Sequence, residues 1–294
     1  MSVARPNRIF AGAAVLAGSG AAAYGAPMSR TALVTGASSG IGRATAAALA
    51  ARGFRVLGTS RTPESLAPGR RAAGVEYVAL DLASADSIEA LAGRLAEVDV
   101  LVNNAGESQS GPFEELPGDA LRRLFQVNVL GPVRLAQLAV PGMRERGYGR
   151  VVMVGSMLAS FPLAYRSSYV ATKAALKGFS HGARHELSPY GVWFTTVEPG
   201  SINTGISERR TRYVADDSPH RRDFETMLAA LDRNERAGVT AERVAATVVA
   251  AIEAARPKAR YAVGSNAPLV FALRRLMPAA LVEKATHRKH GLAR

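Results

Sequence analysis

Residues 31–42 read Thr31-Ala-Leu-Val-Thr-Gly-Ala-Ser-Ser-Gly-Ile-Gly42, an apolar stretch that runs into three glycines. The apolar part has the length of a buried strand, and the glycines mark a tight turn that opens a helix. Glycine is needed where the backbone turns sharply and approaches a pyrophosphate, and the N–H groups of the following helix face the phosphates. The spacing Gly-x-x-x-Gly-x-Gly differs from Gly-x-Gly-x-x-Gly, and no Walker lysine follows. The stretch predicts a nucleotide-binding turn.

The alternation of strand and helix continues along the chain. Strands are expected at residues 31–35, 54–59, 75–80, 98–102, 150–155 and 192–197, with 260–263 as a seventh edge strand. Helices are expected at residues 41–52, 85–97, 119–146, 168–188 and 241–255. Solid apolar runs are typical of strands that are buried on both faces. The pattern predicts an α/β fold: a single doubly wound Rossmann-type domain, whose parallel sheet of about seven strands carries helices on both faces.

Composition agrees with one substantial core, because 48% of the 294 residues are hydrophobic and the mean hydropathy is +0.03. We expect the domain to span residues 28–294. Residues 204–237 carry many charges and little apolar periodicity, which favours a substrate lid over the site. Cysteine is absent, so disulfides, thiolate metal sites and a cysteine nucleophile are excluded. A cytoplasmic location fits this composition.

Residues 1–27 are interpreted as an N-terminal extension that precedes the fold. Arg5 and Arg8 stand before an apolar run at 9–17, which is shorter than the ~20 apolar residues of a membrane span. Three interpretations stay open: a poorly ordered extension, a signal-like or anchoring segment, and a packed helix.

The net charge of +13 is concentrated at the C-terminal end, where residues 257–294 hold eight Lys and Arg against one acid. A solvated basic helix is one interpretation, and a membrane surface or partner contact is another. Nucleic acid is disfavoured, because no stacking aromatics accompany the charge.

A second motif, Asn103-Asn104-Ala105-Gly106, follows the fourth expected strand. Together with the glycine turn it resembles the short-chain dehydrogenase/reductase family, and the resemblance spans about residues 28–204. It implies an oxidoreductase that transfers a hydride between a nicotinamide cofactor and a carbonyl or secondary alcohol. Asp81 matches the family's adenine-contacting Asp, and the Pro199-Gly200 motif is followed by residues that cover the nicotinamide amide. The cofactor-binding residues implied are Gly36, Ser38, Ser39, Gly40, Ile41, Gly42, Ser60, Arg61, Asp81, Asn104, Ala105, Gly106, Tyr169, Lys173, Pro199, Gly200, Ile202 and Thr204.

The second expected strand ends in Gly58-Thr-Ser-Arg-Thr62, without the carboxylate that an NAD enzyme uses to hold the ribose hydroxyls. Ser60 offers a hydroxyl and Arg61 a guanidinium suited to a 2′-phosphate. NADP(H) is therefore the expected cofactor, and NAD(H) stays open.

Tyr169 and Lys173 are four residues apart near the start of an expected helix, so their side chains share one face. A phenol, with an ordinary pKa of about 10, needs a nearby cation before it can take a proton from an alcohol at neutral pH. Ser156 follows the fifth expected strand and can donate a hydrogen bond to a substrate oxygen. Asn128 matches a fourth functional position of the family, where relatives hold a water that relays protons to the lysine.

Several other patterns are weighed beside this interpretation. His181 and His185 have no evident third ligand, so no metal site is expected. Ser156 does not stand in a Gly-x-Ser-x-Gly elbow, which disfavours a serine hydrolase. Met157, Leu158, Phe161, Leu163 and Tyr165 are the apolar pocket candidates, and they hint at a lipophilic ketone or alcohol. A non-catalytic NADP(H)-binding sensor remains the alternative. By resemblance we expect a homodimer or homotetramer.

Overall fold

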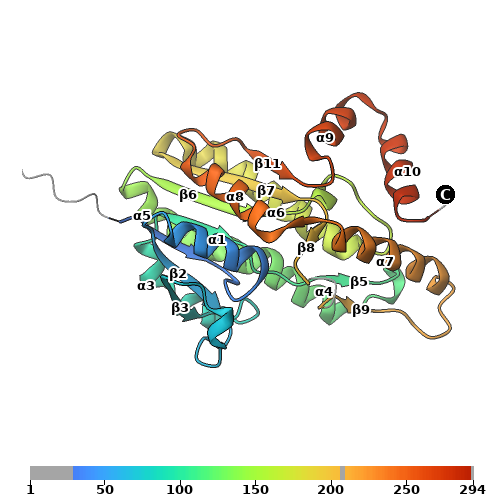
Figure 1. The fold of residues 1–294 in the computed structure, drawn as a ribbon, viewed down its shortest axis with the longest axis horizontal. Coiled ribbons are helices and arrows are strands. Elements are labelled where there is room, and N and C mark those ends of the chain that lie inside the picture. Colours follow the sequence, from blue (N-terminus) through green and yellow to red (C-terminus); the bar gives the residue numbers. More distant parts are fainter. Residues whose placement is uncertain (1–28, 206–208, 293–294) are drawn as a thin grey trace, which may run out of the picture.

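The computed structural model describes residues 29–205 and 209–292 of the chain. Its centre is a seven-stranded parallel sheet in the order β11-β7-β6-β4-β1-β2-β3 (Figure 1). The expected doubly wound fold is confirmed, with the seventh strand at an edge. The strands of this sheet are β1 (Thr31–Val34), β2 (Arg55–Ser60), β3 (Val75–Ala79), β4 (Val100–Asn103), β6 (Gly149–Val154), β7 (Val192–Pro199) and β11 (Arg260–Val263).

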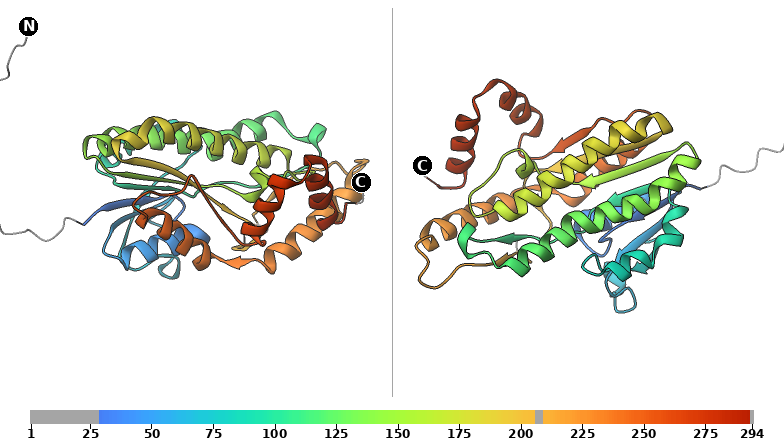
Figure 2. Two further views of the ribbon diagram at one scale, coloured as in Figure 1. Left: turned by 90° about the horizontal axis from the view of Figure 1, so that it is seen from above. Right: turned by 180° about the vertical axis from the view of Figure 1, so that it is seen from behind.

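Helices cover both faces of the sheet (Figure 2). Two pairs of very short strands lie beside it: β5 (Gln109–Ser110) with β9 (Thr211–Arg212), and β8 (Ile202–Asn203) with β10 (Val239–Thr240). The α-helices are α1 (Gly40–Ala50), α2 (Ala85–Glu89), α3 (Ala92–Ala96), α4 (Gly118–Phe125), α5 (Gly131–Glu145), α6 (Ser167–Leu187), α7 (Arg221–Arg236), α8 (Ala241–Glu253), α9 (Ala267–Leu276) and α10 (Ala279–Lys289). Single 3₁₀ turns lie at Pro68–Arg70, Phe113–Glu115, Met157–Ala159 and Ser188–Tyr190.

The solid apolar runs of the strands follow from burial on both faces. In β6, Val151 and Met153 pack in one core with α3, α5 and α6, while Val152 and Val154 pack in the opposite core with α1 and α8. Since successive side chains of a strand point to opposite faces, Val151 to Val154 each meet a helix layer, which favours apolar residues. Arg150 of the same strand is also buried, and its guanidinium donates to the carbonyls of Ile252 and Ala254.

The order in which the chain adds strands to the sheet reverses direction between the neighbours β1 and β4. The strand that follows β1 in the chain, β2, lies on one side of this pair, and β6, which follows β4 in the sheet, lies on the other. Connections that diverge in this way leave a crevice at the carboxyl ends of the strands, which is where open α/β sheets bind ligands.

Two helices that were expected to be continuous are broken. The expected helix 85–97 is divided into α2 and α3, and 119–146 is divided into α4, a π-helical turn at Gln126–Leu130, and α5. Pro132 explains the second break, because it lacks an N–H and its ring crowds the carbonyl of Asn128 four residues earlier. π-Helical turns inside helices frequently mark functional sites.

The expected lid at 204–237 contains more regular structure than its charges suggest. The prediction of little apolar periodicity is wrong for α7, which buries Phe224, Met227, Leu228 and Leu231 in a small core that also includes Leu163. The apolar periodicity of α7 is hard to recognise in the sequence, because charged residues stand between the buried ones along the helix.

The basic C-terminal segment is also more structured than a solvated helix. It forms β11 and then α9 and α10, which project from the body of the molecule as a helical hairpin (Figures 1 and 2). Ala267 and Phe271 of α9 are buried against Met157 and Phe161. The interpretations of residues 1–27 concern a segment outside the described ranges. Within those ranges, no helix is both long and apolar enough to cross a membrane.

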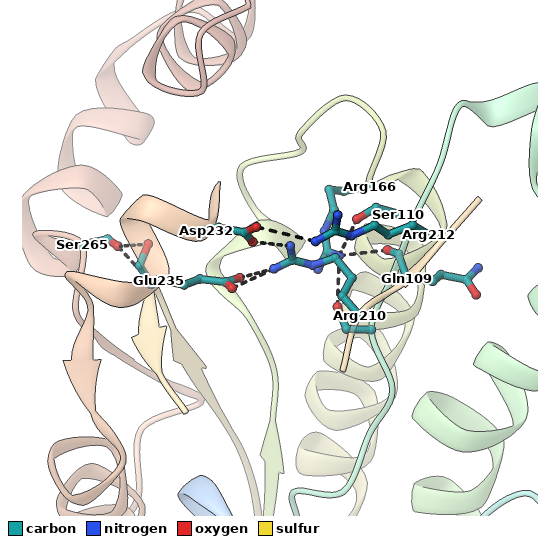
Figure 3. A network of polar contacts seen from close by, with 10 residues as sticks. Gln109, Ser110, Arg166, Arg210, Arg212, Asp232, Glu235 and Ser265 are labelled. Atoms are coloured by element: carbon teal, nitrogen blue, oxygen red, sulfur yellow. Dashed lines mark hydrogen bonds and ion pairs between the residues drawn. The ribbon is translucent and has the colours of Figure 1, made fainter. Parts of the chain in front are cut away.

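A buried arginine connects α7 to the rest of the fold. Arg210 lies between two carboxylates of α7, with its guanidinium 2.7 Å from Asp232 and 2.7 Å from Glu235 (Figure 3). The side chain of Arg210 is fully buried. Burial raises the pKa of the Glu235 carboxyl, and the charge of Arg210 opposes that rise. Arg210 stands directly before β9, so its ion pairs hold α7 to the β5–β9 pair.

The substitution Arg210→Met tests this connection. It leaves two carboxylates of α7 without their partner, and we expect the free energy of unfolding to fall by about 3–5 kcal/mol. Amide hydrogen exchange should rise most within Arg221–Arg236. The matched control is Arg212→Met, because Arg212 is half-exposed and 3.9 Å from Asp232; that variant should lose less than about 1 kcal/mol. Equal losses in the two variants would contradict the role given to Arg210.

Candidate active site

The glycine turn joins β1 to α1 as the sequence predicts. Gly36 and Gly40 have φ angles of +66° and +51°, in the left-handed region that favours glycine. Gly42 is required for a different reason: a Cβ there would collide with the carbonyl oxygen of Gly36 and the side-chain amide of Asn104. The turn is therefore tight, and α1 begins with its first N–H groups toward the crevice.

A buried hydroxyl ties this turn to the loop after β4. Thr35 Oγ1 accepts hydrogen bonds from the backbone N–H groups of Asn104 and Ala105, both at 2.9 Å. In return, the Asn104 side-chain amide donates to the Thr35 carbonyl at 2.8 Å. Because these bonds cross from β1 to β4, they fix the two loops that border the crevice.

One cavity of about 1190 Å³ runs along the carboxyl ends of the strands. Ser156, Tyr169 and Lys173 line it. So do these expected cofactor residues: Gly36, Ser38, Ser39, Gly40, Ile41, Ser60, Arg61, Asp81, Asn104, Ala105, Gly106, Pro199, Gly200, Ile202 and Thr204. Of the expected site residues, Gly42 and Asn128 lie outside the cavity wall.

The end of β2 places Ser60 and Arg61 in the cavity wall. Arg70, from the 3₁₀ turn after β2, lines the same cavity and was missed by the sequence analysis. Its only signal was a basic pair in a loop, which does not reveal where the loop folds. Arg43 has a structural partner, since its guanidinium donates to the Gly69 carbonyl at 2.8 Å. Asp81 also lines the cavity, and its Oδ1 accepts the Ala83 N–H at 2.9 Å.

Tyr169 and Lys173 lie on the same face of α6, and both are buried. Lys173 Nζ donates to the Val154 carbonyl at 3.0 Å and lies 5.7 Å from the centre of the Tyr169 ring. Ser156 lies two residues after the end of β6, and its Oγ accepts the N–H of Leu158 at 3.2 Å. That bond leaves the hydroxyl proton of Ser156 available to donate.

Asn128 does not line the cavity but contacts two segments that form its wall. It lies in the π-helical turn, where its Oδ1 accepts the Glu107 N–H at 2.8 Å and its Nδ2 donates to the Glu107 carbonyl at 3.0 Å. Its Nδ2 also lies 3.3 Å from Thr172 Oγ1 on α6. Asn128 therefore connects the loop after β4 to the helix that carries Tyr169 and Lys173.

Arg166 is a second residue that the sequence analysis missed. Its guanidinium carbon lies 4.3 Å from the centre of the Tyr169 ring, and its Nη1 donates to Gln109 O at 2.9 Å and to the hydroxyls of Ser108 and Ser110, both at 3.0 Å (Figure 3). Burial lowers the pKa of Arg166 to about 10, so it keeps its charge at neutral pH. The sequence signal was only an arginine three positions before the tyrosine.

The apolar pocket candidates are divided by the structure. Met157, Leu158 and Phe161 line the cavity, whereas Leu163 and Tyr165 lie outside its wall and pack against α7. The remaining apolar wall comes from residues that the sequence analysis did not select. They include Leu231 of α7 and Val270, Leu273, Met277 and Val282 of the C-terminal hairpin and its turn.

Comparison with known proteins agrees with this geometry. Residues 30–214 match the family model of the short chain dehydrogenases. The chain is 33% identical over 277 residues to an uncharacterised oxidoreductase, YusZ, of Bacillus subtilis, covering 88% of this chain and 98% of that protein. It is 34% identical to human 17-beta-hydroxysteroid dehydrogenase type 1, covering 80% of this chain and 77% of that protein.

A solved structure shows the same fold. The short chain dehydrogenase of Burkholderia cenocepacia, crystallised with NADP, superimposes with a TM-score of 0.69 at 27% identity, covering 86% of this chain and 95% of that one. The family model covers well over half of the chain, and the resemblance first suggested by the glycine turn and the Asn-Asn-Ala-Gly element is confirmed. The chain therefore belongs to the short-chain dehydrogenase/reductase family and is an oxidoreductase of that family.

Proposed function

We propose that this protein transfers a hydride between NADP(H) and the carbonyl or secondary alcohol of a lipophilic small molecule. One observation carries the proposal: a single cavity brings together the glycine turn, Arg61, and the Ser156, Tyr169 and Lys173 side chains. The glycine turn suits a pyrophosphate. Ser156, Tyr169 and Lys173 suit a reacting oxygen.

The residues present fit a nicotinamide dinucleotide. The tight turn at Gly36–Gly42 leaves the backbone N–H groups near Ser39 free to face phosphate oxygens. When bound, the cofactor supplies or accepts the hydride. Asp81 lines the wall near Leu80 and Leu82 and suits the adenine, and Ile202 and Thr204 suit the nicotinamide amide.

The charges at the end of β2 favour a 2′-phosphate. Arg61 and Arg70 both line the cavity there, beside the Ser60 hydroxyl. Residues 60–62 contain no carboxylate that would repel the phosphate. NAD(H) lacks this group, so it would bind without the contribution of the two arginines. The Burkholderia cenocepacia relative, crystallised with NADP, supports the same assignment.

Proton transfer is assigned to Tyr169. Its phenol donates a proton to the carbonyl oxygen during reduction and takes one from the alcohol during oxidation. Lys173 and Arg166 place two cations near the ring, and positive charge stabilises the phenolate. Ser156 donates a hydrogen bond to the substrate oxygen and orients it. Asn128 holds the loop at Glu107 against α6, which supports the proton relay in this proposal.

The proposed substrate is lipophilic because two separate parts of the chain contribute apolar walls. Met157 and Phe161 follow β6, and Val270, Leu273 and Met277 come from the C-terminal hairpin. The resemblance to a hydroxysteroid dehydrogenase supports a substrate of this kind.

We also place a homodimer or homotetramer interface on the helices that carry Asn128 and Tyr169. Leu130 and Phe179 are large apolar side chains on that side of the fold, and they are 52% and 49% exposed. A second copy of the chain would cover them.

Replacing Tyr169 by phenylalanine tests the mechanism. We expect kcat to fall by about 10²- to 10⁴-fold in a screen of ketones and alcohols, which is the contribution of general acid–base catalysis. NADPH binding, followed by its fluorescence, should change less than about threefold. Tyr190→Phe is the control, since Tyr190 is 55% exposed. Full activity of Tyr169→Phe would refute the mechanism, and NADPH binding without turnover of any substrate by the wild-type protein would favour a sensor.

The cofactor assignment is tested with Arg61→Ala. Loss of a charged hydrogen bond to the phosphate should weaken NADPH binding by about 10- to 100-fold, while NADH binding changes little. Arg55→Ala serves as the control, because Arg55 lies at the opposite end of β2 and is exposed. The assignment is wrong if the two variants bind NADPH equally well.

The role of Arg166 is tested through the pH profile of alcohol oxidation. Arg166→Met removes a cation beside Tyr169, so the rise of kcat with pH should move to more alkaline pH, whereas Arg166→Lys should keep more of the wild-type profile. Arg210, Asp232 and Glu235 lie beyond Arg166 and also contribute to its surroundings. An unchanged profile in Arg166→Met, with only a uniform loss of activity, would assign Arg166 a structural role.

A further inference from the structure

The C-terminal hairpin, residues 267–289, has an anchored base and an exposed tip. At the base, Ala267 and Phe271 are buried. The Ala164 N–H also donates to His287 Nε2 at 3.3 Å. At the tip, the ten consecutive residues 272–281 are all exposed. Figures 1 and 2 show from different directions that both helices stand away from the sheet and its helix layers.

The tip exposes large apolar side chains. Leu276 is 84% exposed, Leu281 is 51% exposed and Leu273 is 44% exposed, and Leu269 on α9 is 61% exposed. Single exposed leucines are ordinary, but several on one projecting element form a patch, and such patches mark contact with a protein or a membrane.

The hairpin also carries many basic side chains, of which Arg274 and Lys289 line the cavity. The hairpin carries Arg274, Arg275, Lys284, Arg288 and Lys289 against a single acid, Glu283. Long basic side chains keep their heads in the polar headgroup layer while their stems cover apolar surface, and they are attracted to anionic lipids. Leucines beside arginines and lysines are typical of elements that lie in a membrane interface.

The geometry and the charge together point to a membrane containing anionic lipid as the partner of this hairpin, and we propose that its tip inserts Leu276 and Leu281 at the headgroup–acyl boundary. A second copy of the chain fits less well, because a twofold contact would bring two basic tips together. A stable protein interface also buries about 800 Å² per partner in matched surfaces. A projecting tip can insert into a fluid bilayer without a complementary surface of fixed shape.

The same hairpin forms part of the cavity wall. Leu273, Met277 and Val282 line the cavity as well as belonging to the hairpin or its turn. A docked tip would therefore bring the wall of the substrate cavity close to the bilayer surface. If the proposed lipophilic substrate is correct, it reaches Tyr169 from the membrane rather than from water. This last step depends on the proposed function, whereas docking itself does not.

Binding of the full chain to lipid vesicles tests the proposal without any substrate or cofactor. Flotation with phosphatidylcholine vesicles containing about 30% phosphatidylserine should recover the protein, and recovery should fall as salt is raised. Pure phosphatidylcholine vesicles should bind it much less. The double variant Leu276→Gln/Leu281→Gln should bind the anionic vesicles at least about tenfold more weakly. Both side chains are exposed, so its thermal unfolding should match that of the wild type.

Two further variants test whether vesicle binding is specific to the hairpin and how much its basic side chains contribute. Phe113→Ser removes an apolar side chain that is also 84% exposed but lies outside the hairpin, and it should leave vesicle binding unchanged. Arg275→Gln/Arg288→Gln should weaken binding by about fivefold for each charge removed.

Three outcomes would overturn the proposal. One is failure of the wild-type chain to bind anionic vesicles at low salt. Another is equal binding by Leu276→Gln/Leu281→Gln and the wild type, which would assign any membrane contact to another segment, such as residues 1–28. The third is that Leu276→Gln/Leu281→Gln sediments as a smaller species than the wild type but binds vesicles as well as the wild type does. The hairpin would then be an interface between copies of the chain.

Discussion

The hydroxyl of Thr35 holds the site together. It is fully buried at the end of β1 and accepts the N–H groups of Asn104 and Ala105 after β4. β1 and β4 are the neighbouring strands at which the strand order reverses, so these two hydrogen bonds join the loops on either side of the crevice. Buried N–H groups need partners. Without this acceptor the loop after β4 would have to move, and Gly106, which faces Asn128, would move with it.

The parts of the fold that sequence reasoning recovered have strong local constraints. A strand covered on both faces favours apolar residues, as at Val151 to Val154 in β6. Ser156, Tyr169 and Lys173 could be placed because the carboxyl end of a strand and one face of a helix are set by a few residues. The glycines were predicted for the same reason, since backbone conformation restricts residue type directly.

The parts that sequence reasoning missed depend on contacts between distant segments. Arg166 bonds to residues 108–110, more than 50 positions away, and those bonds help to hold its guanidinium over Tyr169. Asn128 was matched to a functional position of the family, but its contacts could not be read from the sequence, because its partners Glu107 and Thr172 are 21 and 44 positions away. The hairpin forms a cavity wall because Phe271 packs against Phe161. Charge alone suggested a solvated helix or a contact with a membrane surface or partner, and gave no sign of this wall.

The two ends of the cavity are therefore built differently. The glycine turn is held by backbone groups and by Thr35, so a substitution there disturbs the fold as well as the site. The opposite end is built from side chains of α7 and the hairpin, which are held by their own contacts: the Phe224 cluster and Arg210 for α7, and Phe271 for the hairpin. Because these walls are separate from the bonds that hold the turn, their side chains can change with little effect on it. Substrate preference can therefore vary in this fold while the hydride-transfer geometry stays constant.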